Sequence, residues 1–156
     1  MKLLGKILTG VAVALIGIQF IRPPRNESAG PFPGDIHEVH AVPAPVSDVL
    51  KRHCYDCHSN NTSYPWYTNV QPVGLWMAWH VREGKEHVNF SEFAANKPKR
   101  AAHMMEETYE MVEAREMPLP SYTIIHRDAK LSDEQIKLVA DWARDLEQKI
   151  LGTVKE

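Results

Sequence analysis

The stretch "HCYDCHSNN", residues 53–61, contains both cysteines of the 156-residue chain, Cys54 and Cys57, and a histidine, His58, directly after the second. A redox-active thiol pair belongs beside a strand–helix–strand unit, and no such pattern flanks this stretch. A closed zinc site needs four ligands, usually as two pairs. The chain has no second pair of cysteines, and its other histidines are scattered.

The pattern Cys-x-x-Cys-His is typical of covalent attachment of a c-type haem. Two thiols three residues apart lie on one face of a helical turn, so both can form thioethers with the two vinyl groups of one porphyrin. His58 then lies where the proximal iron ligand is needed. We therefore expect one haem c per chain, attached at Cys54 and Cys57, with His58 bound to the iron.

The sixth iron position has several candidate ligands. Met117 lies in "EMPLP", residues 116–120, where prolines stiffen a loop between two predicted helices. A methionine thioether is a soft, neutral ligand that raises the reduction potential, and we favour it. His80 is the alternative and predicts a bis-histidine haem of low potential. An open iron and three further histidines remain possible, namely His87, His103 and His126.

Other residues are expected around the haem. The second ring nitrogen of a ligating histidine is usually held by a carbonyl, and we expect the carbonyl of Pro72, or else that of Pro65, to do this for His58. Trp76 is expected to pack on the porphyrin. The same role is open to Trp66, Tyr67 and Trp79, whereas three methionines are expected in the core or the haem's apolar wall: Met104, Met105 and Met111.

Residues 1–22 differ in character from the rest of the chain. Lys2 and Lys6 precede an apolar run from Ile7 to Ile18, as in a secretory signal or a single membrane anchor. The run is somewhat shorter than the roughly 20 residues of a transmembrane helix. Bulky residues follow it where a signal peptidase needs small ones, so we favour an uncleaved anchor over a cleaved signal peptide.

The remainder divides into a proline-rich linker, residues 23–45, and a haem-binding domain, residues 46–151. The linker has six prolines and is expected to be extended and weakly ordered. The domain is predicted to be all-α, a small cytochrome c-like fold around one haem, because helical periodicity recurs and no long strand pattern does. Four helices are expected: one that begins with Ser47 as its N-cap, one over residues 73–84, one over residues 99–116, and one that follows a capping box formed by Ser132 and Gln135. Residues 117–130 are expected to form a loop.

Charge limits the classes of partner. Of the 18 basic residues, Lys2, Lys6 and Arg22 lie in the first segment, whereas all 20 acidic residues lie beyond it. Proteins that bind nucleic acid present basic patches, so we expect no nucleic-acid partner.

Several segments together resemble the bacterial haem-binding domain family, over about residues 44–148. They are "CYDCHSNNTSYPWY", "HVREGKEHVNFSEF", "EMPLPSYTIIHRDAKLS" and "LVADWA". The resemblance implies a covalent haem and a cell-envelope location, with Cys54, Cys57 and His58 as the attachment motif and Met117 in the Met-Pro segment. Residues 80–91 are not part of the usual class I cytochrome c pattern, which keeps His80 open as a ligand.

These expectations define the functional hypotheses. The first is a one-electron carrier and not an enzyme, anchored on the periplasmic side of the bacterial inner membrane by its N-terminal helix and serving redox proteins of the envelope. The second is a haem peroxidase or a redox or gas sensor with an open sixth position, where His80 or His103 with Glu106 or Glu107 would be the distal acid–base groups. The third is a haem-binding structural or assembly module.

Overall fold

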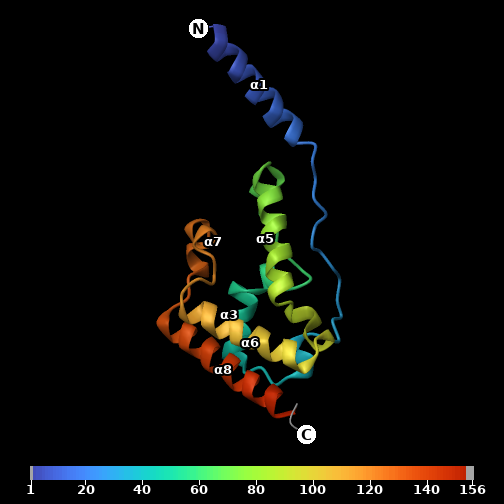
Figure 1. Cartoon of the computed structure of the whole chain (residues 1–156), viewed down its shortest axis with the longest axis vertical. Coiled ribbons are helices and arrows are strands. Elements are labelled where there is room, and N and C mark those ends of the chain that lie inside the picture. The colour runs from blue at the N-terminus through green and yellow to red at the C-terminus, as the bar shows by residue number, and fades with distance from the viewer. Residues whose placement is uncertain (1, 154–156) are drawn as a thin grey trace.

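The computed structural model describes residues 2–153, and within them the chain forms helices and no strand. An N-terminal helix projects from a helical domain (Figure 1). The predicted all-α class is therefore confirmed. In chain order the elements are α1 (Lys2–Ile18), α2 (Ile36–Val39), α3 (Ala44–His53), α4 (Tyr55–His58), η1 (Trp66–Asn69), α5 (Val73–His87), η2 (Phe90–Ala95), α6 (Pro98–Glu113), α7 (Pro120–Ile125), η3 (Arg127–Ala129) and α8 (Asp133–Thr153).

Helices α6 and α8 pack side by side and form the base of the domain (Figure 1). Each buries one stripe of apolar side chains at helical spacing, as their sequences predict. Pro98 occupies the first turn of α6, where its missing N–H costs nothing. The buried stripes are Ala101, Ala102, Met104, Met105 and Val112 on α6, and Val139, Ala140, Trp142, Ala143, Leu146 and Ile150 on α8.

The predicted capping box opens α8. The backbone N–H of Ser132 donates to Oε1 of Gln135 at 2.9 Å, and the backbone N–H of Gln135 donates to Oγ of Ser132 at 3.3 Å. These two bonds satisfy donors that a helix start leaves without partners inside the helix. The capping prediction is confirmed.

Helix α3 carries the cysteine stretch into the domain. Val46, Val49 and Leu50 are buried against the core, and the helix breaks at Cys54, so that α4 forms a separate single turn. Helix α3 begins at Ala44 after Pro43, so the predicted cap at Ser47 is wrong. The Ser47 hydroxyl instead lies 2.8 Å from Nε2 of His37.

Helix α5 packs against α4 at a glycine. A Cβ atom on Gly84 would lie 2.9 Å from the Cys57 carbonyl oxygen and 3.3 Å from Cε1 of His58. Glycine is therefore needed for this close approach of helix and turn. The prediction that the helix ends at Gly84 is wrong, since α5 continues to His87.

The segment 23–45 lies against the domain, so the prediction of weak order is wrong. Asn26 Nδ2 donates to the Ser59 carbonyl at 2.7 Å and to Oγ1 of Thr62 at 2.9 Å. Further along, Asp35 caps α2 and Ile36 is fully buried in the core. Proline limits regular structure here, but the hydrogen bonds of Asn26 and the burial of Ile36 hold the chain against the domain between the prolines.

Residues 117–130 also depart from the predicted loop, because they contain α7. Pro120 occupies the first turn of this helix, which is the one helical position that tolerates proline well. Helix α7 stands opposite α5 across the domain (Figure 1).

Helix α1 buries no side chain, and its C-terminal end adjoins the N-terminal end of α5 (Figure 1). Gln19 and Gln71 join them: the Gln71 N–H donates to Oε1 of Gln19, and Nε2 of Gln19 donates to the Gln71 carbonyl, both at 3.0 Å. Among residues 2–153, no helix reaches the length and hydropathy that crossing a membrane requires.

The contact at Gly84 yields a stability prediction. Gly84→Ala should lower the free energy of unfolding by about 1–3 kcal/mol, because the added methyl group forces the α4 turn away from α5. Urea unfolding followed by circular dichroism measures the change.

Gly152→Ala is the matched control, because a Cβ atom at Gly152 in α8 would meet nothing within 4 Å. The control should be neutral or gain up to about 1 kcal/mol from helix propensity. Equal stability of the two variants would contradict the packing described here.

Candidate haem-binding site

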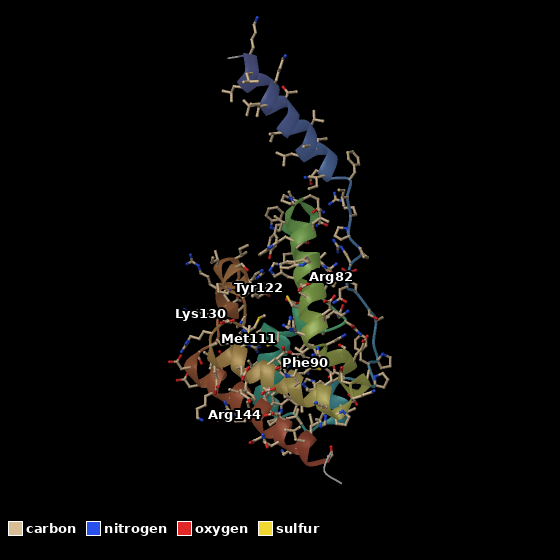
Figure 2. The ribbon with its side chains drawn as sticks, viewed as in Figure 1. Arg82, Phe90, Met111, Tyr122, Lys130 and Arg144 are labelled. Carbon is tan, nitrogen blue, oxygen red and sulfur yellow. The ribbon has the colours of Figure 1, made fainter. Side chains whose placement is uncertain are left out.

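Three adjoining hollows run along the cysteine turn, and we call them together the cleft. The central hollow, about 220 Å³, lies between α4, α5 and the 117–122 segment. It shares Cys57, His80, Leu119 and Tyr122 with the α7 hollow, about 60 Å³. It shares Cys54, His58, His87 and Met117 with the α6 hollow, about 260 Å³. Tyr122, Met111 and Phe90 are labelled around this region in Figure 2.

His58 is held by the chain that follows α5. Its Nδ1 lies 3.0 Å from the Val88 carbonyl oxygen, so Nδ1–H is the donor and Nε2 keeps its lone pair in the neutral ring. Burial lowers the pKa of His58, which favours the neutral form that binds metals. The imidazole is thus fixed in the tautomer that an iron ligand needs.

The carbonyl partner of His58 corrects one prediction. Pro72 does not accept this hydrogen bond, and neither does Pro65, because the acceptor is Val88. Pro72 caps the other end of α5, twelve residues before Gly84, which corresponds to roughly 18 Å along the helix axis. Pro72 is also absent from the lining of the three hollows.

Both cysteines are free and partly buried beside the central hollow. Burial raises the pKa of Cys54 to about 12 and that of Cys57 to about 11. Both side chains are therefore neutral thiols at pH 7. A thiol that adds across a vinyl group forms a thioether without loss of an atom, which is the bond that a c-type haem requires.

Met117 lines the central and α6 hollows together with His58. A sharp turn after α6 brings it there: Arg115 has a φ of 58°, and the N–H groups of Glu116 and Met117 both donate to the Met111 carbonyl. Left-handed backbone is uncommon for a residue with a side chain. The turn returns the chain across the cleft.

His80 lines the central and α7 hollows. Its Nδ1–H donates to the Trp76 carbonyl at 2.8 Å, so its Nε2 also keeps a lone pair. The ring lies between Trp76 and Trp79, with centroids 4.3 and 4.6 Å away. The cleft thus contains both proposed sixth ligands, Met117 and His80.

The remaining histidines are less suitable. His87 lines the cleft, but its Nδ1 lies 3.6 Å from Oε1 of Glu107. His126 is engaged by the Tyr67 hydroxyl and stacks on Tyr122. His103 lines none of the three hollows and pairs with Glu106 at 3.0 Å on the surface.

Aromatic side chains line one end of the cleft. Trp76 borders the α7 hollow beside Cys57 and is 43% exposed. Tyr122 spans the α7 and central hollows, and its hydroxyl donates to Oδ2 of Asp56 at 3.3 Å. Sequence reasoning predicted Trp76 as a haem contact and overlooked Tyr122.

The polar lining of the cleft is acidic. Carboxylates reach it from Asp56, Glu83, Glu107 and Glu110, and no lysine or arginine lines the three hollows among the described residues. One carboxylate oxygen, Oε2 of Glu107, is buried without a hydrogen-bond partner. Negative charge beside an iron centre favours its oxidised form.

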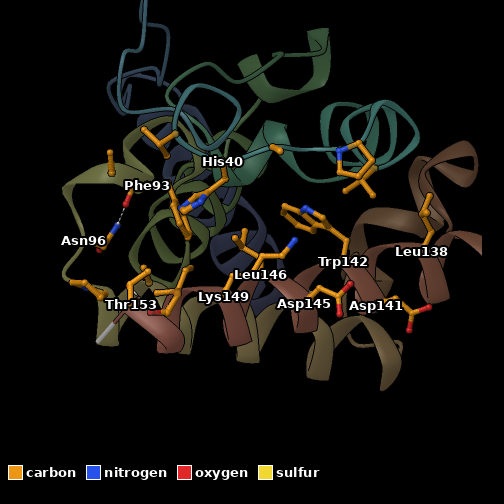
Figure 3. Close-up of a pocket in the computed structure, with 18 residues that line it drawn as sticks. His40, Phe93, Asn96, Leu138, Asp141, Trp142, Asp145, Leu146, Lys149 and Thr153 are labelled. Atoms are coloured by element: carbon orange, nitrogen blue, oxygen red, sulfur yellow. Dashed lines mark hydrogen bonds between the residues drawn. The ribbon is translucent and has the colours of Figure 1, made fainter. Parts of the chain in front are cut away.

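A separate hollow of about 690 Å³ lies between α8 and the 39–46 segment. Phe93, Trp142 and Leu146 form its apolar wall, with Asp141, Asp145 and Lys149 at its edge (Figure 3). It shares no residue with the cleft. The chemistry-bearing residues of the cysteine stretch therefore belong to the cleft alone.

The residues of the cleft fit a haem. The hollows together fall in the roughly 300–1,000 Å³ range of cofactor sites, and their walls are largely apolar. Cys54, Cys57 and His58 share the central hollow, and Nε2 of His58 is free to bind iron. Met117 and His80 are available as further ligands.

Besides Tyr122, two further contributors to the site escaped sequence reasoning. Val88 acts through its carbonyl, and Gly84 acts by having no side chain. Neither has chemistry that a motif search detects. Their only signal is that both lie in "HVREGKEHVNFSEF", the segment that departs from the usual cytochrome c pattern.

One comparison with known proteins found a match. A family model described as a haem-binding domain matches residues 13–145, which is most of the chain. No curated protein and no solved structure gave a match. The chain belongs to the haem-binding domain family, and haem is its cofactor.

Proposed function

We propose that this chain is a c-type cytochrome that carries single electrons in the bacterial cell envelope. In this proposal, one haem is joined covalently to Cys54 and Cys57, and His58 is the proximal iron ligand. The observation that carries the proposal is the His58 Nδ1–Val88 hydrogen bond, because it presents Nε2 of His58 to a hollow that both cysteine side chains line. Bound haem supplies reversible one-electron chemistry between ferric and ferrous iron.

Two internal ligands favour a carrier over an enzyme. Met117 and His80 both reach the central hollow with His58, and occupation of the sixth position by either excludes an exogenous substrate from the iron. A peroxidase or gas sensor needs that position open. Of the distal groups suggested for such an enzyme, His103 lies outside the cleft and bonds to Glu106 on the surface, whereas His80 and Glu107 line the cleft.

We propose that α1 anchors the protein in the cytoplasmic membrane with the haem domain on the periplasmic side. Its 17 residues span about 26 Å, and a helix shorter than the roughly 30 Å hydrocarbon layer is accommodated by local thinning. The exposed apolar side chains of α1 support this role. Redox proteins of the envelope are the expected partners.

The sixth ligand is tested by spectroscopy of the haem-loaded protein. If Met117 binds iron, the oxidised protein has a far-red charge-transfer band that Met117→Ala abolishes while His80→Ala leaves it intact. A low-spin oxidised protein that lacks this band, and that becomes high-spin in His80→Ala but not in Met117→Ala, identifies a bis-histidine haem instead. Met111→Ala is the matched control, because Met111 lines only the α6 hollow of the cleft.

Rapid binding of carbon monoxide by the unmodified ferrous protein would contradict the electron-carrier proposal and favour the sensor or peroxidase class. Slow or negligible binding that becomes rapid in the variant lacking the sixth ligand supports the carrier.

The carboxylate of Glu107, one oxygen of which is buried, is expected to lower the reduction potential. Glu107→Gln should raise the potential by on the order of tens of millivolts, because it removes negative charge near the iron. Potentiometric titration of the haem measures the change. Glu134→Gln, at an exposed position on α8, should leave the potential unchanged; an equal shift in both variants would contradict a local effect.

A further inference from the structure

Large apolar side chains are exposed together at one end of the domain. Trp66 is 78% exposed, Ile124 is 74% exposed and Ile125 is 59% exposed, with Trp76 less so. Trp76 and Ile125 line the α7 hollow, and Trp66 and Ile124 are chain neighbours of residues that do. We call these four residues the rim. Soluble surfaces seldom expose apolar groups in such a cluster without a binding role.

Helix α1 is attached at the same end of the domain. Three hydrogen bonds of 3.0 Å join Gln71, which lies between η1 and α5, to Gln19 and Ile21 after the helix. The Arg22 guanidinium adds a bond of 2.6 Å to the Asn69 carbonyl. The direction of α1 relative to the rim is therefore set by the fold, and α1 points away from the domain (Figure 1).

We propose that the rim rests in the interfacial layer of the lipid bilayer that α1 enters. This inference rests on the proposed anchoring role of α1. It assigns the domain a fixed orientation, in which the α7 end of the cleft lies against the membrane and helix α8 lies on the side away from it.

The chemistry of the rim fits a bilayer surface. Tryptophan is enriched at the membrane–water interface, because its ring is apolar and its N–H is polar. Phe20 and Ile21, which are 83% and 53% exposed, continue the apolar surface from α1 toward the rim. Arg22 and Arg25 lie at the same junction, where cationic groups meet lipid phosphates.

The order of residues along α5 relates the rim to the haem site. Val73 and Trp76, at the start of α5, line the α7 hollow. Glu83 and Gly84, two to three turns further along, line the central hollow. The α7 hollow is thus the part of the cleft nearest to α1, so the cleft meets the bilayer at its aromatic end.

The four tryptophans provide a direct test. Full-length haem-loaded protein is placed in phosphatidylcholine nanodiscs with or without bromine atoms on the acyl chains near the headgroup, which quench tryptophan emission on contact. Three variants are made by Trp→Phe substitution. The first retains Trp66 and Trp142, the second retains Trp76 and Trp142, and the third retains Trp142 alone. The ratio of emission with and without bromine cancels the constant quenching by the haem.

Trp142 alone is the matched control, because it is 8% exposed and lies on α8, away from α1. We expect the emission contributed by Trp66 or Trp76 to fall on the order of twofold with bromine, as at an interfacial position, and the emission of Trp142 to stay constant.

Other outcomes overturn the inference. If the protein remains with the nanodiscs but Trp66 and Trp76 are not quenched, the anchor stands and the rim faces solvent or a protein partner. If Trp142 is quenched equally, the domain has no fixed orientation. If the protein elutes apart from the nanodiscs, the anchoring proposal fails as well.

Discussion

The close approach of α5 to the cysteine turn is the constraint on which the rest of the structure depends. Gly84 lets the Cys57 carbonyl and the His58 ring lie against the helix backbone, and the chain leaving α5 then brings the Val88 carbonyl to Nδ1 of His58. A side chain at Gly84 would separate these groups. The orientation of the His58 imidazole is therefore a consequence of helix packing and not of the cysteine motif alone.

The other walls of the cleft are attached to this pair of elements. Helix α6 contributes the wall around Met111 and, through the left-handed turn at Arg115, positions Met117. Helix α7 supplies Tyr122 on the opposite side from α5 (Figure 2). Helix α8 contributes no residue to the three hollows, and by packing on α6 it holds that wall in place.

Local sequence signals predicted the elements that local physics determines. Helical periodicity and the Ser132–Gln135 box identified α6 and α8, because both depend on residues three or four apart. Helix α7 was missed, since Pro120 was interpreted as a breaker and in fact starts the helix. The anchors of segment 23–45 and the Val88 carbonyl depend on contacts between residues 30 or more positions apart, which no local pattern reveals.

The covalent bond between chain and porphyrin is the central claim. The most direct measurement is the intact mass of protein matured in a host with a cytochrome c assembly system, after acid–acetone extraction. The account predicts the mass of the chain plus one haem, and the bare mass for a variant with both Cys54→Ala and Cys57→Ala. A colourless wild-type protein with the bare mass of the polypeptide, and with all haem in the organic phase, would contradict it.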